Sequence, residues 1–365
     1  MKRIATFLVL TNFLFYFKQC HAQFFELNNT YPWTGWISQL DSLDNTLVAH
    51  AKNGGGSLIY RLDSAGNVIS SNNEDLYTGG THGSMKVKNN KVFFHAFVDQ
   101  CDYYDNSFYV YRFDSTLQIE RAMNSFEWEQ QDNPFYNLEG PHFDSKFIPI
   151  NDSVIAIVSF DRFVVLNMNV PEVLVNMDYP FGDVYGMYSI STEIDSVFIY
   201  GYGGIFLFND NTIVSLNEVP TYWLEKYNGA FYRKGGGIEK LDAEFDVVAS
   251  NNLSPSKIQF DQGLLYCKYG NDMYILDQDL DVVSTGSFEA LGNFSATDFC
   301  KYNDQYYLGG YNGCSYFNEG TTGCLKNYSL DFETDNFDQD IGITDINIVG
   351  YNFYPGVSIP KTRTG

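Results

Sequence analysis

The sequence predicts an all-β protein, a seven-bladed β-propeller built from four-stranded antiparallel blades. Two observations predict it: one turn motif recurs seven times, and short segments of alternating apolar and polar residues fill the chain, with little helical periodicity. In each copy an apolar residue followed by Asp or Asn ends an alternating segment, and successive copies lie 33 to 53 residues apart. The seven copies are Leu62-Asp63, Phe113-Asp114, Leu166-Asn167, Phe208-Asn209, Leu241-Asp242, Leu276-Asp277 and Phe317-Asn318.

A second hairpin upstream of each copy brings every repeat to four strands. Its two segments are joined by polar turns such as Asn-Asn, Asn-Gly or Asp-Gln-Gly, which tolerate the backbone angles of tight hairpins. A single four-stranded unit cannot bury both of its faces, whereas a closed ring of such units does. The predicted blades are residues 35–73, 82–124, 142–177, 184–219, 221–251, 256–287 and 296–329.

Two other architectures fit parts of this pattern. A β-sandwich would also contain many short alternating strands, although it has no reason to repeat one motif seven times. A ring of six or eight blades is the other alternative, because the flanking segments 23–34 and 330–350 could add or complete strands.

Residues 1–22 have the composition of a cleaved signal peptide. A basic start, "MKR", precedes the apolar stretch "IATFLVLTNFLFYF", and "KQCHA" ends in a small residue suited to cleavage after Ala22. We therefore predict export to the cell surface or the medium. The predicted domains are the signal peptide 1–22, the propeller 23–329, and an acidic linker with the possible start of a further domain at 330–365.

The charge of the chain excludes several partner classes. The formal net charge is −23, and removal of residues 1–22 takes it to −26 because that segment holds three basic residues and no acidic one. So acidic a surface repels nucleic acid and anionic lipid. We predict no nucleic-acid partner, no membrane insertion and a monomeric chain.

The end of the chain resembles a known secretion signal. The portion "IGITDINIVGYNFYP" is similar to the start of the C-terminal sorting domain of type IX secretion cargo, which opens near a Tyr-Pro-Asn-Pro motif. Tyr354 and Pro355 match that motif, but Gly356 and Val357 replace its Asn and Pro, and the chain stops before such a domain could be complete. The resemblance implies a secreted β-propeller of the type IX cargo kind, with a truncated or degenerate sorting domain.

Two enlarged loops of blade two are the predicted ligand-binding region. Segments 98–107 and 124–141 should rise on one face of the ring, where propellers commonly carry function. Their aromatic rings lie among carboxylates, a combination that suits sugar rings, although the same aromatics could simply pack the loops onto the blades. The candidate binding residues of these loops are Tyr103, Tyr104, Trp128 and Tyr136.

Two histidines complete the candidate site. His82 and His142 precede the innermost strands of blades two and three, so they should lie near each other beside the central channel. Histidines there could bind a metal or transfer protons near neutral pH, whereas hydrogen-bonded structural histidines are the simpler interpretation. His50 and His95 fall inside second strands, where they are expected to pack in the core.

No cofactor is predicted, and calcium is a candidate ion. In "DQDLD", Asp277, Asp279 and Asp281 resemble the start of a calcium loop, but Val282 occupies the position that requires glycine. The acidic linker Asp331–Asp340 is a second candidate. The chain also lacks the G-x-S-x-G, H-E-x-x-H, Walker and dinucleotide-binding motifs.

These observations favour a non-catalytic binding module for a glycan or a protein ligand. One alternative is a secreted glycoside hydrolase or lyase on the loop face of blades two and three, with His82, His142 and acids such as Glu127 transferring protons. A structural or adhesive surface protein is the other alternative.

Overall fold

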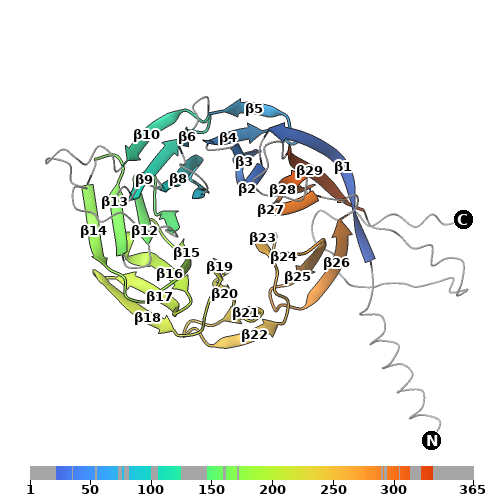
Figure 1. Ribbon diagram of the computed structural model, residues 1–365. Coiled ribbons are helices and arrows are strands. Elements are labelled where there is room, and N and C mark those ends of the chain that lie inside the picture. Colours follow the sequence, from blue (N-terminus) through green and yellow to red (C-terminus); the bar gives the residue numbers. More distant parts are fainter. Residues whose placement is uncertain are drawn as a thin grey trace, which may run out of the picture.

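The computed structural model is a ring of seven four-stranded antiparallel sheets, a seven-bladed β-propeller with almost no helix (Figure 1). No helix in the described part of the chain is long and apolar enough to cross a membrane. The structure describes residues 22–34, 36–53, 56–72, 76–77, 82–99, 106–124, 146–158, 162–170, 172–288, 291, 294–303, 305–312 and 322–331.

Blades one to three form three successive sheets, each with its innermost strand first in the chain. Blade one contains β2 (Trp36–Leu43), β3 (Thr46–Asn53), β4 (Gly56–Leu62) and β5 (Val68–Ser71), with β6 (Leu76–Tyr77) also paired to β4; blade two contains β7 (His82–Lys88), β8 (Lys91–Asp99), β9 (Asn106–Phe113) and β10 (Ile119–Asn124); blade three contains β11 (Lys146–Pro149), β12 (Val154–Val158), β13 (Arg162–Asn167) and β14 (Glu172–Asp178).

The remaining blades continue in the same order around the ring. Blade four contains β15 (Val184–Ser189), the 3-10 turn η2 (Ile194–Ser196), β16 (Val197–Gly201), β17 (Gly204–Asn209) and β18 (Thr212–Asn217); blade five contains β19 (Trp223–Tyr227), β20 (Ala230–Lys234), β21 (Ile238–Leu241) and β22 (Val247–Asn251); blade six contains β23 (Lys257–Asp261), β24 (Leu264–Tyr269), β25 (Asp272–Leu276) and β26 (Val282–Phe288); blade seven contains β27 (Phe294–Tyr302), β28 (Gln305–Asn312), β29 (Thr322–Asp331) and β1 (Ala22–Thr34).

Blade seven is completed by the first strand of the fold, so the prediction that 296–329 forms four strands by itself was wrong. β1 pairs antiparallel with β29 and parallel with the outer strand of blade six, β26. The segment 23–34, which was expected either to add strands to the ring or to complete a blade, is therefore the fourth strand of blade seven. The ring closes because the two ends of the fold share one sheet, as Figure 1 shows.

Apolar clusters between neighbouring blades hold the ring together. The described residues form seven such clusters, one at each junction between blades. Between blades one and two, for example, Ile59 packs with Phe94, Phe113 and Leu117, all of which are buried. Burial of both faces of each sheet accounts for the apolar middle strands that the sequence displays.

The repeated turn motif has one structural role in four blades. In blade two, Asp114 Oδ1 accepts hydrogen bonds from the backbone N–H groups of Thr116 and Gln118, at 2.8 and 3.0 Å. Leu117 between them has φ +66° and buries its side chain between the blades. The same two bonds to an aspartate occur at Asp63, Asp242 and Asp277.

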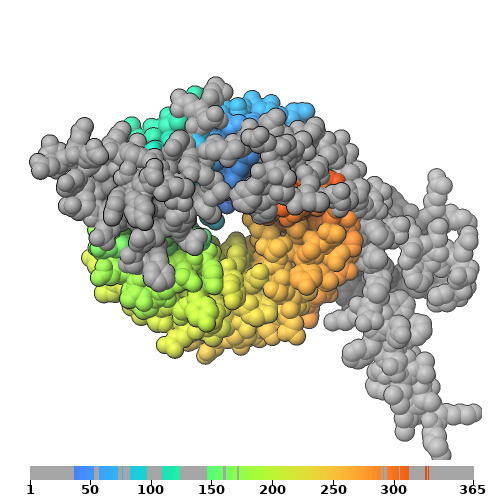
Figure 2. Space-filling model, viewed as in Figure 1, coloured from blue at the N-terminus to red at the C-terminus, as the bar shows by residue number. Residues whose placement is uncertain are grey.

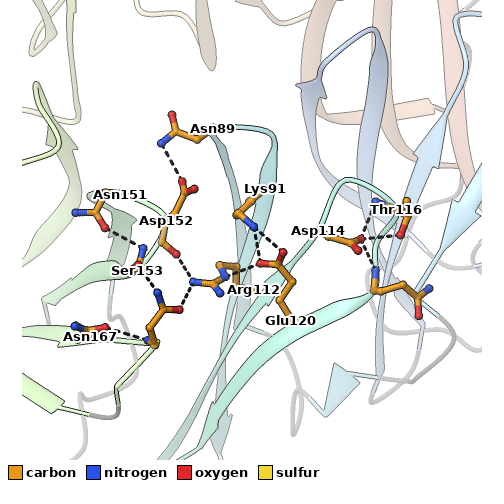
Figure 3. Close-up of polar contacts among 12 residues, drawn as sticks. Asn89, Lys91, Arg112, Asp114, Thr116, Glu120, Asn151, Asp152, Ser153 and Asn167 are labelled. Atoms are coloured by element: carbon orange, nitrogen blue, oxygen red, sulfur yellow. Dashed lines mark hydrogen bonds and ion pairs between the residues drawn. The ribbon is translucent and has the colours of Figure 1, made fainter.

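Buried arginines join blades through polar contacts (Figure 3). Arg112 of β9 is 7% exposed, and its Nε donates to Glu120 Oε2 at 2.8 Å within blade two. Its Nη1 donates to the backbone oxygen of Asp152 and, at 2.9 Å, to Asn169 Oδ1, both in turns of blade three. Arg233 repeats this arrangement between blades five and four, with Glu239 Oε2 at 2.5 Å and Asn217 Oδ1 at 2.8 Å.

Candidate functional site

One face of the ring carries the loops that lead into the inner strands and the loops between second and third strands. In blade four these loops are hydrogen-bonded to each other, since the N–H of Tyr202 donates to the oxygen of Asp183 at 3.0 Å. The N–H of Thr221, which leads into blade five, likewise donates to the oxygen of Gly201 at 3.0 Å. We call this side of the propeller the loop face.

Most of the predicted binding residues fall outside the part of the chain that the structure describes. His82 is the first residue of β7 and its backbone pairs with Phe97, which agrees with its predicted place at the start of an inner strand. Its side chain is not described. Tyr103, Tyr104, Trp128, Tyr136 and His142 lie outside the described residues, so their role stays a prediction.

The histidines predicted to pack in the core do so. His50 is fully buried, with Nδ1 2.7 Å from Ser38 Oγ and Nε2 2.9 Å from Ser57 Oγ. His95 is also buried and stacks on Phe147, with ring centroids 5.4 Å apart. Burial lowers the pKa of both histidines to about 3, so both are neutral at pH 7.

A group of exposed tyrosines lies on the loop face of blades four and five. The tyrosine cluster consists of Tyr185 near the start of β15, Tyr202 between β16 and β17, and Tyr222 just before β19. Their exposed fractions are 37%, 65% and 47%. The rings of Tyr185 and Tyr222 lie 4.8 Å apart between centroids, with an angle of 32° between their planes.

The backbone beneath the tyrosine cluster is fixed. A side chain at Gly201 would collide with the backbone oxygen of Asp183, so only glycine allows the two loops to pack this closely. Loss of hydration, the nearby Tyr222 and the Asp183 carboxylate raise the pKa of Tyr185. The cluster therefore presents neutral phenol rings and hydroxyl groups beside one exposed carboxylate.

The second candidate site is the central channel, whose opening Figure 2 shows beside blades five and six. Five charged side chains from inner strands interact electrostatically there: Asp41 of β2, Lys86 of β7, Glu225 of β19, Lys257 of β23 and Asp298 of β27. We call them the channel cluster. Lys257 Nζ lies 2.9 Å from Asp298 Oδ1, and the N–H of Leu40 donates to Asp298 Oδ2 at 2.7 Å.

The channel cluster perturbs the ionisation of its own members. Loss of hydration raises the pKa of Glu225 to about 7, although Lys86 and Lys257 oppose that shift. Loss of hydration also raises the pKa of Asp41 and lowers that of Lys86. Lys257 behaves in the opposite way, because Asp298 raises its pKa despite burial. Of the five residues, Lys86 is exposed, Asp41, Glu225 and Lys257 are half-buried, and Asp298 is buried.

Sequence reasoning missed both sites, although a signal for the channel cluster was present. In three blades a charged residue occupies the same position of the inner strand, three residues before the turn to the second strand begins. These residues are Asp41, Lys86 and Glu225. Comparing this position between repeats would have revealed three charged residues facing one channel. The tyrosine cluster left no repeat-related signal, since its members come from different positions of two blades.

The calcium candidates in "DQDLD" have another structural explanation. Asp277 Oδ1 accepts N–H bonds from Asp279 and Asp281, at 2.9 and 3.0 Å, as the equivalent aspartates of other blades do. Within the described residues, no group of three or more His, Cys, Asp or Glu side chains is arranged to hold a metal ion. Calcium binding by this chain stays a prediction.

Comparison with known proteins adds little to this geometry. No protein-family model matches the chain, and no curated protein matches its sequence. Solved structures do match, and one of them is the AfRom2 CNH domain, with a TM-score of 0.49 and 10% sequence identity. That match covers 82% of this chain and 98% of the other. A likeness at this level says nothing about function.

Proposed function

We propose that this propeller is a non-catalytic binding module whose ligand is a glycan, bound on the loop face at the tyrosine cluster. The single observation that carries the proposal is the exposed pair Tyr185 and Tyr222, whose rings lie 4.8 Å apart beside Asp183. Large aromatic side chains normally bury most of their area, so adjacent exposed rings on a loop face are typical of a binding surface.

The chemistry of the cluster suits a carbohydrate. The C–H faces of a sugar ring stack on phenol rings, while its hydroxyl groups donate to carboxylates such as Asp183 and exchange hydrogen bonds with tyrosine hydroxyls. The aromatic residues Trp128 and Tyr104 are predicted from the sequence to lie in loops of the same kind. They would extend such a surface along the ring from the tyrosine cluster.

A glycan array tests the proposal. The purified protein is compared with the Tyr185→Ala, Tyr222→Ala double variant and with Trp128→Ala. Tyr269→Ala is the matched control, because Tyr269 ends β24 on the same face, is 50% exposed and lies outside the tyrosine cluster. Each stacked ring contributes about 0.5 to 1.5 kcal/mol beyond its buried area, so the double variant should bind roughly tenfold to a hundredfold more weakly.

The outcomes separate the possible functions. Binding that the double variant loses and Tyr269→Ala keeps would support the site. Absence of binding to any glycan by a folded sample would refute the glycan proposal, as would equal binding by the double variant. Any glycan that binds is then incubated with the protein. Cleavage that disappears in Glu225→Gln would replace the binding module with a hydrolase that uses Glu225 as an acid.

We also propose that the protein acts outside the cell or on its surface. The support comes from the signal-peptide composition of residues 1–22 and from the resemblance of the chain's end to type IX cargo. Expression in a bacterium that possesses this secretion pathway, followed by mass spectrometry of the medium and the cell surface, should find a chain that begins at Gln23. Intact Met1 in the cytoplasmic fraction alone would refute export.

A further inference from the structure

The loops that carry the tyrosine cluster contain exposed acidic side chains, Asp183 and Glu218, but no basic one. No lysine, arginine or histidine occurs in the three segments that form these loops, residues 179–190, 199–205 and 217–223. The oxygen of Asp183 accepts the N–H of Tyr202 at 3.0 Å, and a Cβ atom at Gly204 would lie 2.8 Å from the Cα atom of Glu218. The backbones of both acidic residues therefore lie against the turn Gly201–Gly204, which carries Tyr202.

The lysine beside the tyrosine cluster binds elsewhere. The backbone oxygen of Lys234 accepts the N–H of Tyr222 at 2.7 Å, but its ammonium donates to the oxygen of Pro255, at 2.6 Å, in the loop that leads into blade six. Among the residues that the structure describes, no ion pair within 4.0 Å involves Asp183 or Glu218. The tyrosine cluster is therefore bordered by negative charge that the described protein does not balance with an ion pair.

Exposed aromatic rings beside an unpaired carboxylate suit an ammonium group. The face of a tyrosine ring carries partial negative charge and attracts a cation that lies over it, and a carboxylate adds an ion pair. The net charge of −23 also draws cations toward this surface. A neutral sugar would use the rings for stacking and leave the charge uncompensated, whereas a sugar with a protonated amino group would use both.

We propose that the ligand of the tyrosine cluster is a cationic glycan, a chain of hexosamine units whose amino groups are free and protonated. Its sugar rings stack on the adjacent rings of Tyr185 and Tyr222, which lie 4.8 Å apart between centroids. Its ammonium groups bind the Asp183 carboxylate and the faces of the tyrosine rings. This inference rests on the proposed function, because it specifies the class of glycan that the same site binds.

Isothermal titration calorimetry at pH 6 tests the proposal with two matched tetrasaccharides. The β-1,4-linked glucosamine tetramer and cellotetraose have the same backbone and differ at C2, where an ammonium group replaces a hydroxyl group. The glucosamine tetramer should bind about threefold to thirtyfold more tightly, which is the combined contribution of one exposed cation–π contact and one exposed ion pair. Raising the NaCl concentration from 0.05 M to 0.5 M should reduce this preference, because salt screens exposed charges.

Three variants locate the charge recognition. Asp183→Asn removes the carboxylate but keeps the backbone oxygen that binds Tyr202, so it should weaken binding of the glucosamine tetramer at least twofold more than binding of cellotetraose. The Tyr185→Ala, Tyr222→Ala double variant should weaken binding of both tetramers. Glu244→Gln is the matched control, because it removes one exposed charge from the turn between β21 and β22, on the opposite face of the ring, and should leave the preference unchanged. Melting temperatures verify that each variant is folded.

The outcomes distinguish failure of this inference from failure of the proposed function. Equal affinity for the two tetramers, or an Asp183→Asn variant that keeps the full preference, would overturn the cationic glycan and leave glycan binding intact. If the glucosamine tetramer does not bind, the inference fails, and if no glycan on the array binds either, the proposed function fails with it. Tetralysine is the third probe: binding as tight as that of the glucosamine tetramer, and lost equally in Asp183→Asn, would assign the site to basic peptides and overturn the inference.

Discussion

Replacing Arg112 with methionine should weaken the junction between blades two and three. Methionine keeps the apolar stem but removes the guanidinium group, which donates to Glu120 Oε2, to the oxygen of Asp152 and to Asn169 Oδ1. Glu120 would keep its ion pair with Lys91, at 2.6 Å, so the main loss is the two bonds that cross to blade three.

The size of the effect follows from those two bonds. Hydrogen bonds to a charged group contribute about 1.5 to 3 kcal/mol each when their partners are buried. The acceptors in the blade-three turns are partly accessible to water after the change, so we take the lower end, about 3 kcal/mol in total. With a urea m-value of about 3 kcal/mol/M, expected near the upper end of the usual range for a large domain, the midpoint should fall by about 1 M.

Urea unfolding followed by circular dichroism and tyrosine fluorescence measures this shift. Arg162→Met is the control, because Arg162 contacts the exposed Asp178 at 3.0 Å and such a surface pair contributes below about 1 kcal/mol. If both variants shift the midpoint equally, the bonds across the blade junction contribute no more than a surface ion pair, and the reasoning about Arg112 fails.

Three other predictions concern closure, turn geometry and pH. Deleting residues 22–34 should expose the edges of β26 and β29 and produce aggregation or non-cooperative unfolding, measured by size-exclusion chromatography and thermal melting; a monomer with unchanged melting would contradict this. Leu280 has φ +67° and is 2% exposed, so changing it to alanine should lower the free energy of unfolding by about 2 to 4 kcal/mol. Changing it to glycine should lower that free energy no further, because glycine relieves the strain of the left-handed backbone. A glycine variant much less stable in urea than the alanine variant would refute the strain. His50 should make the protein sensitive to acid. Burial depresses the pKa of His50 in the folded protein to about 3, whereas its pKa in the unfolded chain is near 6.5. The stabilisation from His50 is therefore complete above pH 6.5 and declines as the pH falls toward 3, with a loss of about 2 kcal/mol at pH 5. The difference between the urea midpoints at pH 7 and pH 5 should be smaller in His50→Gln than in the unmodified protein, and an unchanged difference would show that the histidine is uninvolved.

The sequence predicted the ring because the blades repeat local chemistry. The aspartates at positions 63, 114, 242 and 277 form the same turn in the structure, and the predicted blade limits agree with the observed strands to within a few residues for blades two, four, five and six. Local turn preference and strand alternation carry that information, and both are visible in a short window of sequence.

The closing strand and the sites depend on contacts that no short window contains. Residues 22–34 pair with a strand that begins almost three hundred residues later, and no turn connects them. The alternation of apolar and polar residues indicates that Lys86 and Glu225 lie on inner strands. It does not show that closure of the ring turns these two strands toward one another. Tyr185 and Tyr222 likewise become neighbours only when blades four and five pack. The predicted loop residues of blade two stay a prediction.

The pairing of β1 with β29 also has a consequence for the order of folding. During synthesis the strand at Ala22–Thr34 emerges first, yet its partner at Thr322–Asp331 does not exist until nearly the whole fold has been made. The six blades between them can form from local hairpins, whereas closure must bring together the most distant residues of the domain. The first strand to be translated should therefore be among the last to dock, and the unclosed ring should be the slow species in refolding.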